Sequence, residues 1–153
     1  IHSAVITGLN GVGKSIYIKS VALSILMAQS GFYVAADEYN LNLYHKLYTR
    51  IGNNDNLIKG QSTFYREMLE LDTILRNADS KTLVIADELC SGSEQASAQA
   101  ILASTIETLN NRKTSCLITT HFQDCLKLEE LIQLNGFQIY HFSITNQEGN
   151  IIY

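Results

Sequence analysis

The residues with the clearest chemical pattern are positions 8–15, GLNGVGKS, which fit the spacing GxxxxGK[ST]. A short apolar run, Ser3 to Thr7, precedes them and a helical pattern follows, which is the setting of a phosphate-binding loop. Glycines allow the tight backbone path, so successive N–H groups and the helix start attract an anion. Lys14 would contact the β- and γ-phosphates, and the Ser15 hydroxyl would bind Mg²⁺. The motif therefore predicts nucleotide binding, and the alternative is a glycine-rich turn that binds nothing.

A pair of acidic residues forms the second candidate site. Asp87 and Glu88 follow the apolar run Thr82 to Ala86, and open α/β sheets bind ligands at the carboxyl ends of their strands. We expect Asp87 to support Mg²⁺ and Glu88 to accept a proton from an attacking water. The alternative is a solvated acidic turn. A similar pair, Asp37-Glu38, follows a weaker apolar run, and we interpret it as a surface pair.

The sequence predicts alternating strands and helices that would position these residues. Hydrophobic periodicity predicts strands at Ser3–Thr7, Phe32–Ala36, within Tyr39–Ile51, at Thr82–Ala86, Thr114–Thr120, Phe137–Thr145 and Asn150–Tyr153. It predicts helices at Ser15–Gln29, Thr63–Asn77, Glu94–Asn110 and Gln123–Leu134, and Gly52–Gly60 is expected to be a surface loop. This alternation indicates an α/β fold, a mostly parallel sheet flanked by helices, with a C-terminal antiparallel hairpin around residues 146–149.

Length and composition narrow the class of protein. The 153 residues predict one domain, and 46% hydrophobic with 17% charged residues is a globular balance. No apolar run approaches the ~18 residues of a membrane span, and no secretory signal precedes the first strand. The net charge of −4 argues against a DNA-gripping surface on this segment. An odd number of cysteines without CxxC spacing predicts reduced thiols and an intracellular protein, its compartment open among cytoplasm, nucleus, mitochondrion and viral factory.

Several further motifs occur in a fixed order after the glycine-rich loop. They are TRIG at 49–52, DNL at 55–57, GQSTF at 60–64, EML at 67–69, IL at 74–75, DEL at 87–89 and THF at 120–122. The set resembles the ATPase domain of MutS-type DNA mismatch-recognition proteins, a branch of the ABC ATPase superfamily, over about residues 4–145. The segment DELCSGSE at 87–94 resembles the MutS branch of giant viruses and coral mitochondria.

The resemblance implies a P-loop NTPase fold of ABC type that hydrolyses ATP to ADP with Mg²⁺. The nucleotide-binding residues would be Gly8, Asn10, Gly11, Val12, Gly13, Lys14, Ser15 and Ile16. Ser15 and Asp87 would hold the metal, Glu88 would be the general base, and His121 would contact the γ-phosphate. The whole protein would use an ATP-driven dimer switch in recognising mismatched DNA.

The resemblance also implies where partners bind. Gln61, Ser62 and Thr63 would form a signature loop that reaches into the partner subunit's nucleotide site, and Leu89 to Ser93 would cross the dimer interface. The dimer would be a homodimer or a heterodimer. DNA would be bound by domains outside this chain, and no membrane partner is implied. By the same comparison the domain is truncated on its N-terminal side.

The sequence departs from the family pattern in places, and alternatives remain. Proline and threonine are usual where Leu9 and Ile16 stand, and Gly-Arg is usual at Cys90-Ser91. Judged without the resemblance, Ser62 could be an ordinary helix cap and His121 a half-buried core residue. An SMC-like or transporter ABC motor is a second function, although GQSTF differs from the transporter signature. A MutS-like recombination-control protein that does not hydrolyse ATP is a third.

Overall fold

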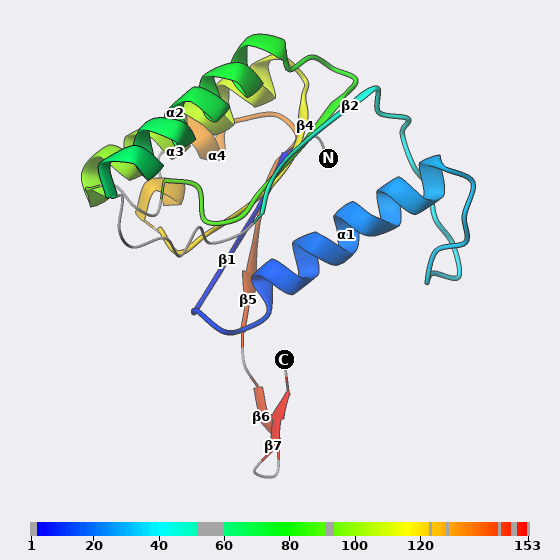
Figure 1. Cartoon of the computed structure of the whole chain (residues 1–153). Helices are drawn as coiled ribbons and strands as arrows, with labels where there is room; N and C mark the ends of the chain where they lie inside the picture. The colour runs from blue at the N-terminus through cyan, green and yellow to red at the C-terminus, as the bar shows by residue number, and fades with distance from the viewer. Residues whose placement is uncertain are drawn as a thin grey trace.

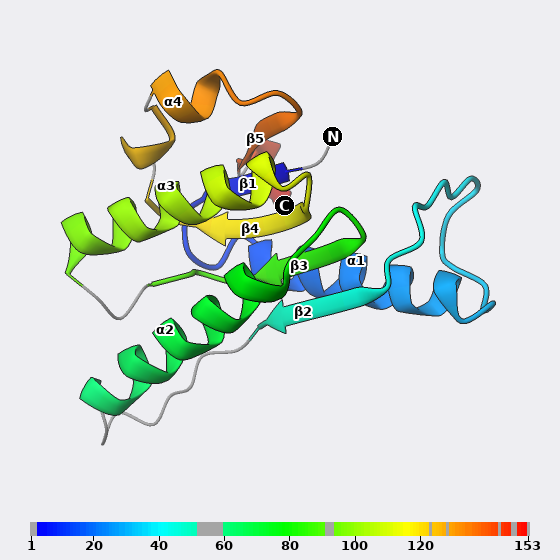
Figure 2. The same ribbon diagram turned by 90° about the horizontal axis from the view of Figure 1, so that it is seen from above.

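A five-stranded, all-parallel sheet forms the centre of the computed structural model, which describes residues 3–51, 60–90, 94–122, 124–127, 129–143, 145–147 and 150–152. The strand order is β2-β3-β4-β1-β5, as Figure 2 shows from above. The strands are β1 (Ser3–Gly8), β2 (Lys46–Arg50), β3 (Thr82–Ala86), β4 (Ser115–Thr120) and β5 (Phe137–Phe142). The α/β class and the parallel sheet flanked by helices are therefore confirmed.

Helices cover both faces of this sheet unequally (Figure 1). Helix α1 (Lys14–Gln29) covers one face, where Ile18 and Ile25 pack with Ile6 and Ile85. The other face carries α2 (Gly60–Asn77), α3 (Gln95–Asn111), a 3-10 helix at Asp124–Lys127 and the short α4 (Glu129–Ile132). Because side chains alternate along a strand, β3 sends its odd and even residues to opposite sides, and all five of its residues are buried.

The expected strand at Phe32–Ala36 is wrong. The structure has no strand there, and Phe32 and Tyr33 are 68% and 97% exposed. Aromatic residues favour strands only where they can pack on a sheet, and this segment lies beyond the end of α1. The predicted stop at Ser30-Gly31 is confirmed, since Gly31 has φ +77° and the Phe32 N–H donates to the Met27 carbonyl at 2.9 Å.

Three other boundaries differ from the sequence-based expectation. Only Lys46–Arg50 of the range Tyr39–Ile51 is a strand, where it pairs with β3. The helix expected over Gln123–Leu134 is replaced in the described part by the 3-10 helix and α4. Helix α2 begins at Gly60 rather than at Thr63. Helix ends depend on local hydrogen bonds that periodicity does not report, which explains such shifts.

The C-terminal segment expected as one strand over Phe137–Thr145 is divided. Its first part, β5, pairs in parallel with β1 and ends at Phe142. β6 (Thr145–Gln147) then pairs in antiparallel fashion with β7 (Asn150–Ile152), in a separate two-stranded sheet. Of the expected loop at Gly52–Gly60, residues 52–59 lie outside the described part of the chain, and Gly60 is the first residue of α2. No helix in the described ranges is long and apolar enough to cross a membrane.

Candidate functional site

The candidate site lies at the edge of the sheet where the parallel strands end. Strand β1 ends at Gly8, β3 at Ala86 and β4 at Thr120, and the pairing register places these ends at one edge (Figure 1). The glycine-rich loop leaves β1, the acidic pair leaves β3, and His121 leaves β4. The fold thus brings the candidate residues from three separate motifs to one side of the molecule.

The glycine-rich loop joins β1 to α1 in the expected setting. Gly13, directly before the helix, has φ +96°, a conformation that side chains on an L-residue disfavour. Gly8 is fixed by space, because an added Cβ would lie 2.8 Å from the Phe142 carbonyl oxygen. Asn10 and Gly11 are exposed at the turn between them. A larger residue would be strained at Gly13 because of the backbone angle and at Gly8 because of the close packing.

Three side chains of the loop region point in different directions. Val12 is 5% exposed and anchors the loop, whereas Ile16 is 74% exposed on α1. Ser15 is partly buried in the first turn of the helix. The exposure of Ile16 means that this departure from the family's threonine does not disturb core packing.

Lys14 connects the loop to the acidic pair. Its Nζ donates to the carbonyl oxygens of Gly8 and Leu9, each at 2.9 Å. The same atom lies 3.9 Å from the Glu88 Oε1, and the Lys14 side chain is 4% exposed. The Glu88 carboxylate partly compensates the charge of this nearly buried ammonium group, and the two opposite charges lie together at the carboxyl edge. The structure thus brings the sequence-predicted lysine and the sequence-predicted acid together.

The acidic turn is held by groups from neighbouring strands. The Asp87 N–H donates to the Arg50 carbonyl at 2.8 Å. The Thr119 hydroxyl donates to the Asp87 Oδ1 at 2.5 Å and accepts from the Glu88 N–H at 3.0 Å. Sequence reasoning missed Thr119, a fully buried residue of β4. The sequence showed Thr119 only as a hydroxyl residue near the end of a run of β-favouring residues.

Glu67, on α2, belongs to one of the motifs of the resemblance, but no role was assigned to it from the sequence. It is 4% exposed, and its Oε1 accepts from the Cys90 N–H at 2.7 Å and from the Arg50 Nε at 3.1 Å. Burial, with a smaller effect of the Glu67 carboxylate, raises the pKa of the Cys90 thiol to about 12. Burial also raises the pKa of Cys116 to about 11. Both thiols are free, as the sequence predicted for reduced cysteines, and a thiol protonated at neutral pH is a poor nucleophile.

His121 and the start of α2 were also expected at the site. His121 directly follows β4 and is exposed rather than half-buried. The centroid of its ring lies 4.2 Å from that of Phe122, with the two rings tilted at 45°. Gln61, Ser62 and Thr63 form the first turn of α2, within the helix, so Ser62 does not occupy the cap position. The side chains of these three residues, and Ser91 to Ser93 of the expected interface loop, lie outside the described part of the structure.

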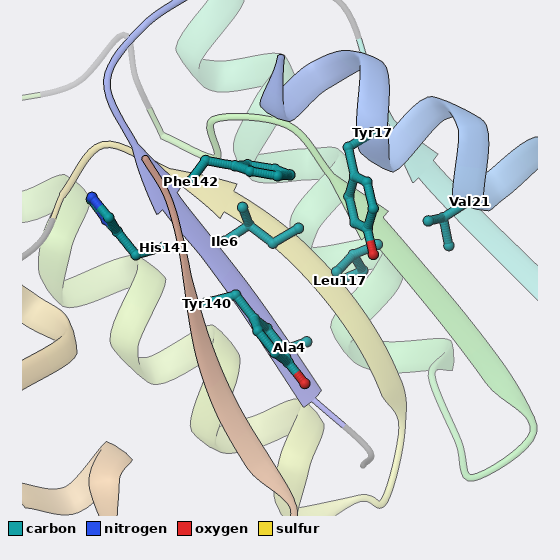
Figure 3. Close-up of a pocket in the computed structure, with 8 residues that line it drawn as sticks. All are labelled: Ala4, Ile6, Tyr17, Val21, Leu117, Tyr140, His141 and Phe142. Atoms are coloured by element: carbon teal, nitrogen blue, oxygen red, sulfur yellow. The ribbon is translucent and has the colours of Figure 1, made fainter. Parts of the chain in front are cut away.

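A cavity of about 440 Å³ lies between α1 and the strands β1, β4 and β5 (Figure 3). Its lining is mostly apolar, with Ile6, Tyr17, Leu117 and Phe142 around it. Phe142 packs edge-on against Tyr17, with ring centroids 5.4 Å apart. The His141 ring turns to the other side of β5, where its Nδ1 lies 2.9 Å from the Thr7 hydroxyl.

Fold and site together define a parallel α/β domain whose charged residues meet at the carboxyl edge of the sheet, around a glycine-rich strand-to-helix loop. Residues 4–153 match the family model for MutS domain V. The chain belongs to the MutS family.

Relatives of known name agree with this family. The chain is 42% identical over 144 residues to a DNA mismatch repair mutS homologue of Acanthamoeba polyphaga mimivirus, covering 92% of this chain and 13% of the relative. It is 40% identical over 144 residues to the mitochondrial mutS homologue of Sarcophyton glaucum (94% and 14%). It is 42% identical over 151 residues to the DNA mismatch repair protein MutS of Clostridium botulinum (97% and 16%).

The coverage and identity values limit what these relatives say about this chain. The chain spans 13% to 16% of the length of these relatives. Viral, coral and bacterial proteins match it at nearly equal identity, so the assignment to the giant-virus and coral branch stays a prediction.

Proposed function

We propose that this chain is the ATP-binding and ATP-hydrolysing domain of a MutS-like DNA mismatch repair protein. It would be a P-loop domain of ABC type whose nucleotide state drives a dimer switch coupled to mismatched DNA. The observation that carries the proposal is the position of Lys14 between the glycine-loop carbonyls and Glu88. A lysine in that place can bind phosphate oxygens, and Glu88 lies next to it as the proposed general base.

The loop suits a polyphosphate. A Cβ added at Gly11 or Gly13 would meet nothing within 4 Å, so the described neighbours do not crowd the loop at these two positions. The N-terminus of α1 follows directly and contributes partial positive charge. Backbone N–H groups of residues 11–15, together with Lys14, would therefore hold the β- and γ-phosphates.

Mg²⁺ fits the oxygen donors that the site offers. No group of three His, Cys, Asp or Glu side chains is placed to hold a metal within the described ranges. Mg²⁺ in phosphate-binding sites is commonly bound by one or two protein oxygens together with phosphate and water. Ser15 and Asp87 would supply those oxygens, and Thr119 orients the Asp87 carboxylate. The ion would neutralise charge that develops on the phosphate oxygens.

The reaction is attack of water on the γ-phosphorus. Glu88 takes the proton from the attacking water, a new P–O bond forms, and the bond to the β-phosphate oxygen breaks to release ADP. Lys14 stabilises negative charge on the transferred phosphoryl group. His121, exposed at the end of β4, would contact the γ-phosphate or the water, and its exposure leaves the ring accessible.

The dimer and DNA parts of the proposal rest on the family. Gln61 to Thr63 would contribute to the partner subunit's site from the start of α2. Because a ligand shifts only those states that it binds unequally, tighter ATP binding by the closed dimer would provide the switch. Mismatched DNA would be bound by other domains of the protein. The names of the viral, coral and bacterial relatives support this role in mismatch repair.

Replacement of the loop lysine tests the proposal in the full-length protein. We expect Lys14→Ala to weaken ATP binding by roughly 100-fold or more, because a charge-assisted contact to two phosphates is lost. Isothermal titration calorimetry measures the effect. Lys19→Ala, an exposed lysine of the same helix, is the matched control and should bind ATP normally. Equal ATP affinity in Lys14→Ala and the unsubstituted protein would contradict nucleotide binding at this loop.

A further inference from the structure

The turn that carries the proposed general base has an unusual backbone. Glu88 and Cys90 have φ of +48° and +65°, and neither is glycine. Such conformations persist only where surrounding groups hold them. The backbone of this turn directly sets where the Glu88 side chain points, so the groups that hold it also set the distance from Glu88 to Lys14.

Hydrogen bonds from three other elements hold the turn. Asp87 is bonded to the Arg50 carbonyl of β2, and Glu88 to the Thr119 hydroxyl of β4. The third bond runs from the Cys90 N–H to the Glu67 Oε1, at 2.7 Å, and it fixes the second left-handed residue. In the described part of the chain, α2 is therefore tied to this turn through the Glu67 carboxylate.

Glu67 is itself held firmly. It is 4% exposed, and the Arg50 Nε donates to the same oxygen at 3.1 Å, which compensates the buried charge. Arg50 is in turn bonded through Nη1 to Glu70, which is on the exposed side of α2, at 2.6 Å. A buried, paired carboxylate that accepts a backbone N–H from a strained turn is placed to keep that turn in one conformation.

We propose that Glu67 is a positioning residue for the catalytic turn and ties it to α2. This inference rests on the proposed ATPase function and deepens it. Glu67 lies five residues after Ser62, about 7.5 Å along the helix axis at 1.5 Å per residue. Helix α2 therefore connects the proposed trans loop at its start to the proposed base at the end of β3. A shift of α2 on dimer closure would move the Cys90 backbone and, with it, Glu88.

Two conservative substitutions separate the reach of the side chain from its charge. Glu67→Gln keeps the length and an acceptor oxygen for the Cys90 N–H, but loses the charge beside Arg50. Glu67→Asp keeps the charge, but its carboxylate is one methylene too short to reach Cys90. Glu70→Gln, which alters only the exposed partner of Arg50, is the matched control.

If Glu67 positions the turn, the length of its side chain should matter more for ATP hydrolysis than its charge. In the full-length protein, Glu67→Asp should lower kcat for ATP hydrolysis by roughly 10- to 100-fold, because the base is misplaced. ATP affinity should change by less than about twofold, since the phosphate loop is untouched. Glu67→Gln and Glu70→Gln should hydrolyse ATP at close to the original rate. Normal kcat in folded Glu67→Asp, or equal losses in Glu67→Asp and Glu67→Gln, would overturn the inference.

Hydrogen–deuterium exchange gives a readout that does not need turnover. The amide of Cys90 should exchange faster in Glu67→Asp, or in Glu67→Ala if the aspartate variant is not recovered folded, and at the original rate in Glu67→Gln. If the unsubstituted protein does not hydrolyse ATP, the proposed function fails, and this exchange comparison decides on the Glu67 anchor alone. Unchanged exchange at Cys90 in all variants would overturn the anchor.

Discussion

The glycine-rich loop and the acidic turn meet at one edge of the sheet, yet they are held in opposite ways. The loop depends mainly on neighbours in the chain: its glycine angles, the start of α1 and the bonds from Lys14 to Gly8 and Leu9 lie within a few residues, although Gly8 also packs closely on the Phe142 carbonyl. The acidic turn depends on other elements, through the Arg50 carbonyl, Thr119 and Glu67. We therefore expect substitutions in the glycine-rich loop to weaken nucleotide binding, and substitutions around the acidic turn to lower catalysis.

The largest effect expected in the turn comes from the base itself. Glu88→Gln in the full-length protein should keep ATP binding and lower hydrolysis by roughly 10²- to 10⁴-fold, because the amide cannot accept the proton from water. Dimer carrying ATP should accumulate. Steady-state phosphate release and analytical ultracentrifugation measure the two effects.

The matched control for this substitution is Glu38→Gln in the exposed Asp37-Glu38 pair. It should leave hydrolysis unchanged, which would support the interpretation of that pair as a surface feature. Full turnover in Glu88→Gln would assign the base elsewhere and remove the functional contrast between the loop and the turn.

A smaller effect is expected from the strand that supports the turn. Thr119→Val keeps the shape of the side chain but leaves Asp87 and the Glu88 N–H without their shared partner. We expect hydrolysis to fall about tenfold, and the local free energy of unfolding to fall by about 1–3 kcal/mol, since buried polar groups are left unpaired. Phosphate release and hydrogen exchange of β3 and β4 measure these changes.

Thr82→Val is the control for Thr119→Val. Thr82 is equally buried, but it lies at the opposite end of β3, where its hydroxyl bonds to Asp79 at 2.8 Å. The control should lose stability without losing hydrolysis at the measured temperature. If both valine variants hydrolyse ATP equally well, Thr119 acts on packing alone and the acidic turn needs less support than we infer.

The smallest effect concerns the edge of the sheet away from the site. Hydrogen bonds from Lys46, Thr82 and the Lys81 N–H hold the pKa of Asp79 at about 2, below its usual 3.8. Because the folded-state pKa is lowered, the carboxylate stabilises the fold above about pH 4, and this contribution is lost as the pH falls towards 2. In Asp79→Asn, the protection of the β2 and β3 amides from hydrogen exchange should therefore decrease less steeply between pH 4 and pH 2.

Hydrogen exchange of the β2 and β3 amides between pH 4 and pH 2 measures this effect. Lys46→Gln, which removes the main hydrogen-bond donor to Asp79, should act in the same direction. ATP hydrolysis at neutral pH should be unchanged in both variants, because this ion pair is exposed and distant from the carboxyl edge. An equally steep acid response in Asp79→Asn would show that other groups control it.

The sequence was a good guide where structure depends on neighbours in the chain. Its patterns located β1, β3, β4 and α1 to within about one residue, because apolar periodicity and glycine stops act over short ranges. It failed at Phe32–Ala36, where β-favouring residues have no sheet to join, and at Gln123–Leu134, where one amphipathic pattern covers two short helices.

The candidate site, too, has features that depend on neighbours in the chain and features that depend on distant contacts. The sequence by itself determined the glycine loop, Lys14 and the two acids, since each is written in consecutive residues with fixed backbone demands. Only the tertiary structure decided that Lys14 lies beside Glu88, and that Thr119 and Glu67 hold the turn. Each of those contacts joins residues at least 23 positions apart, on elements whose arrangement depends on packing of the whole sheet. No local pattern carries that information.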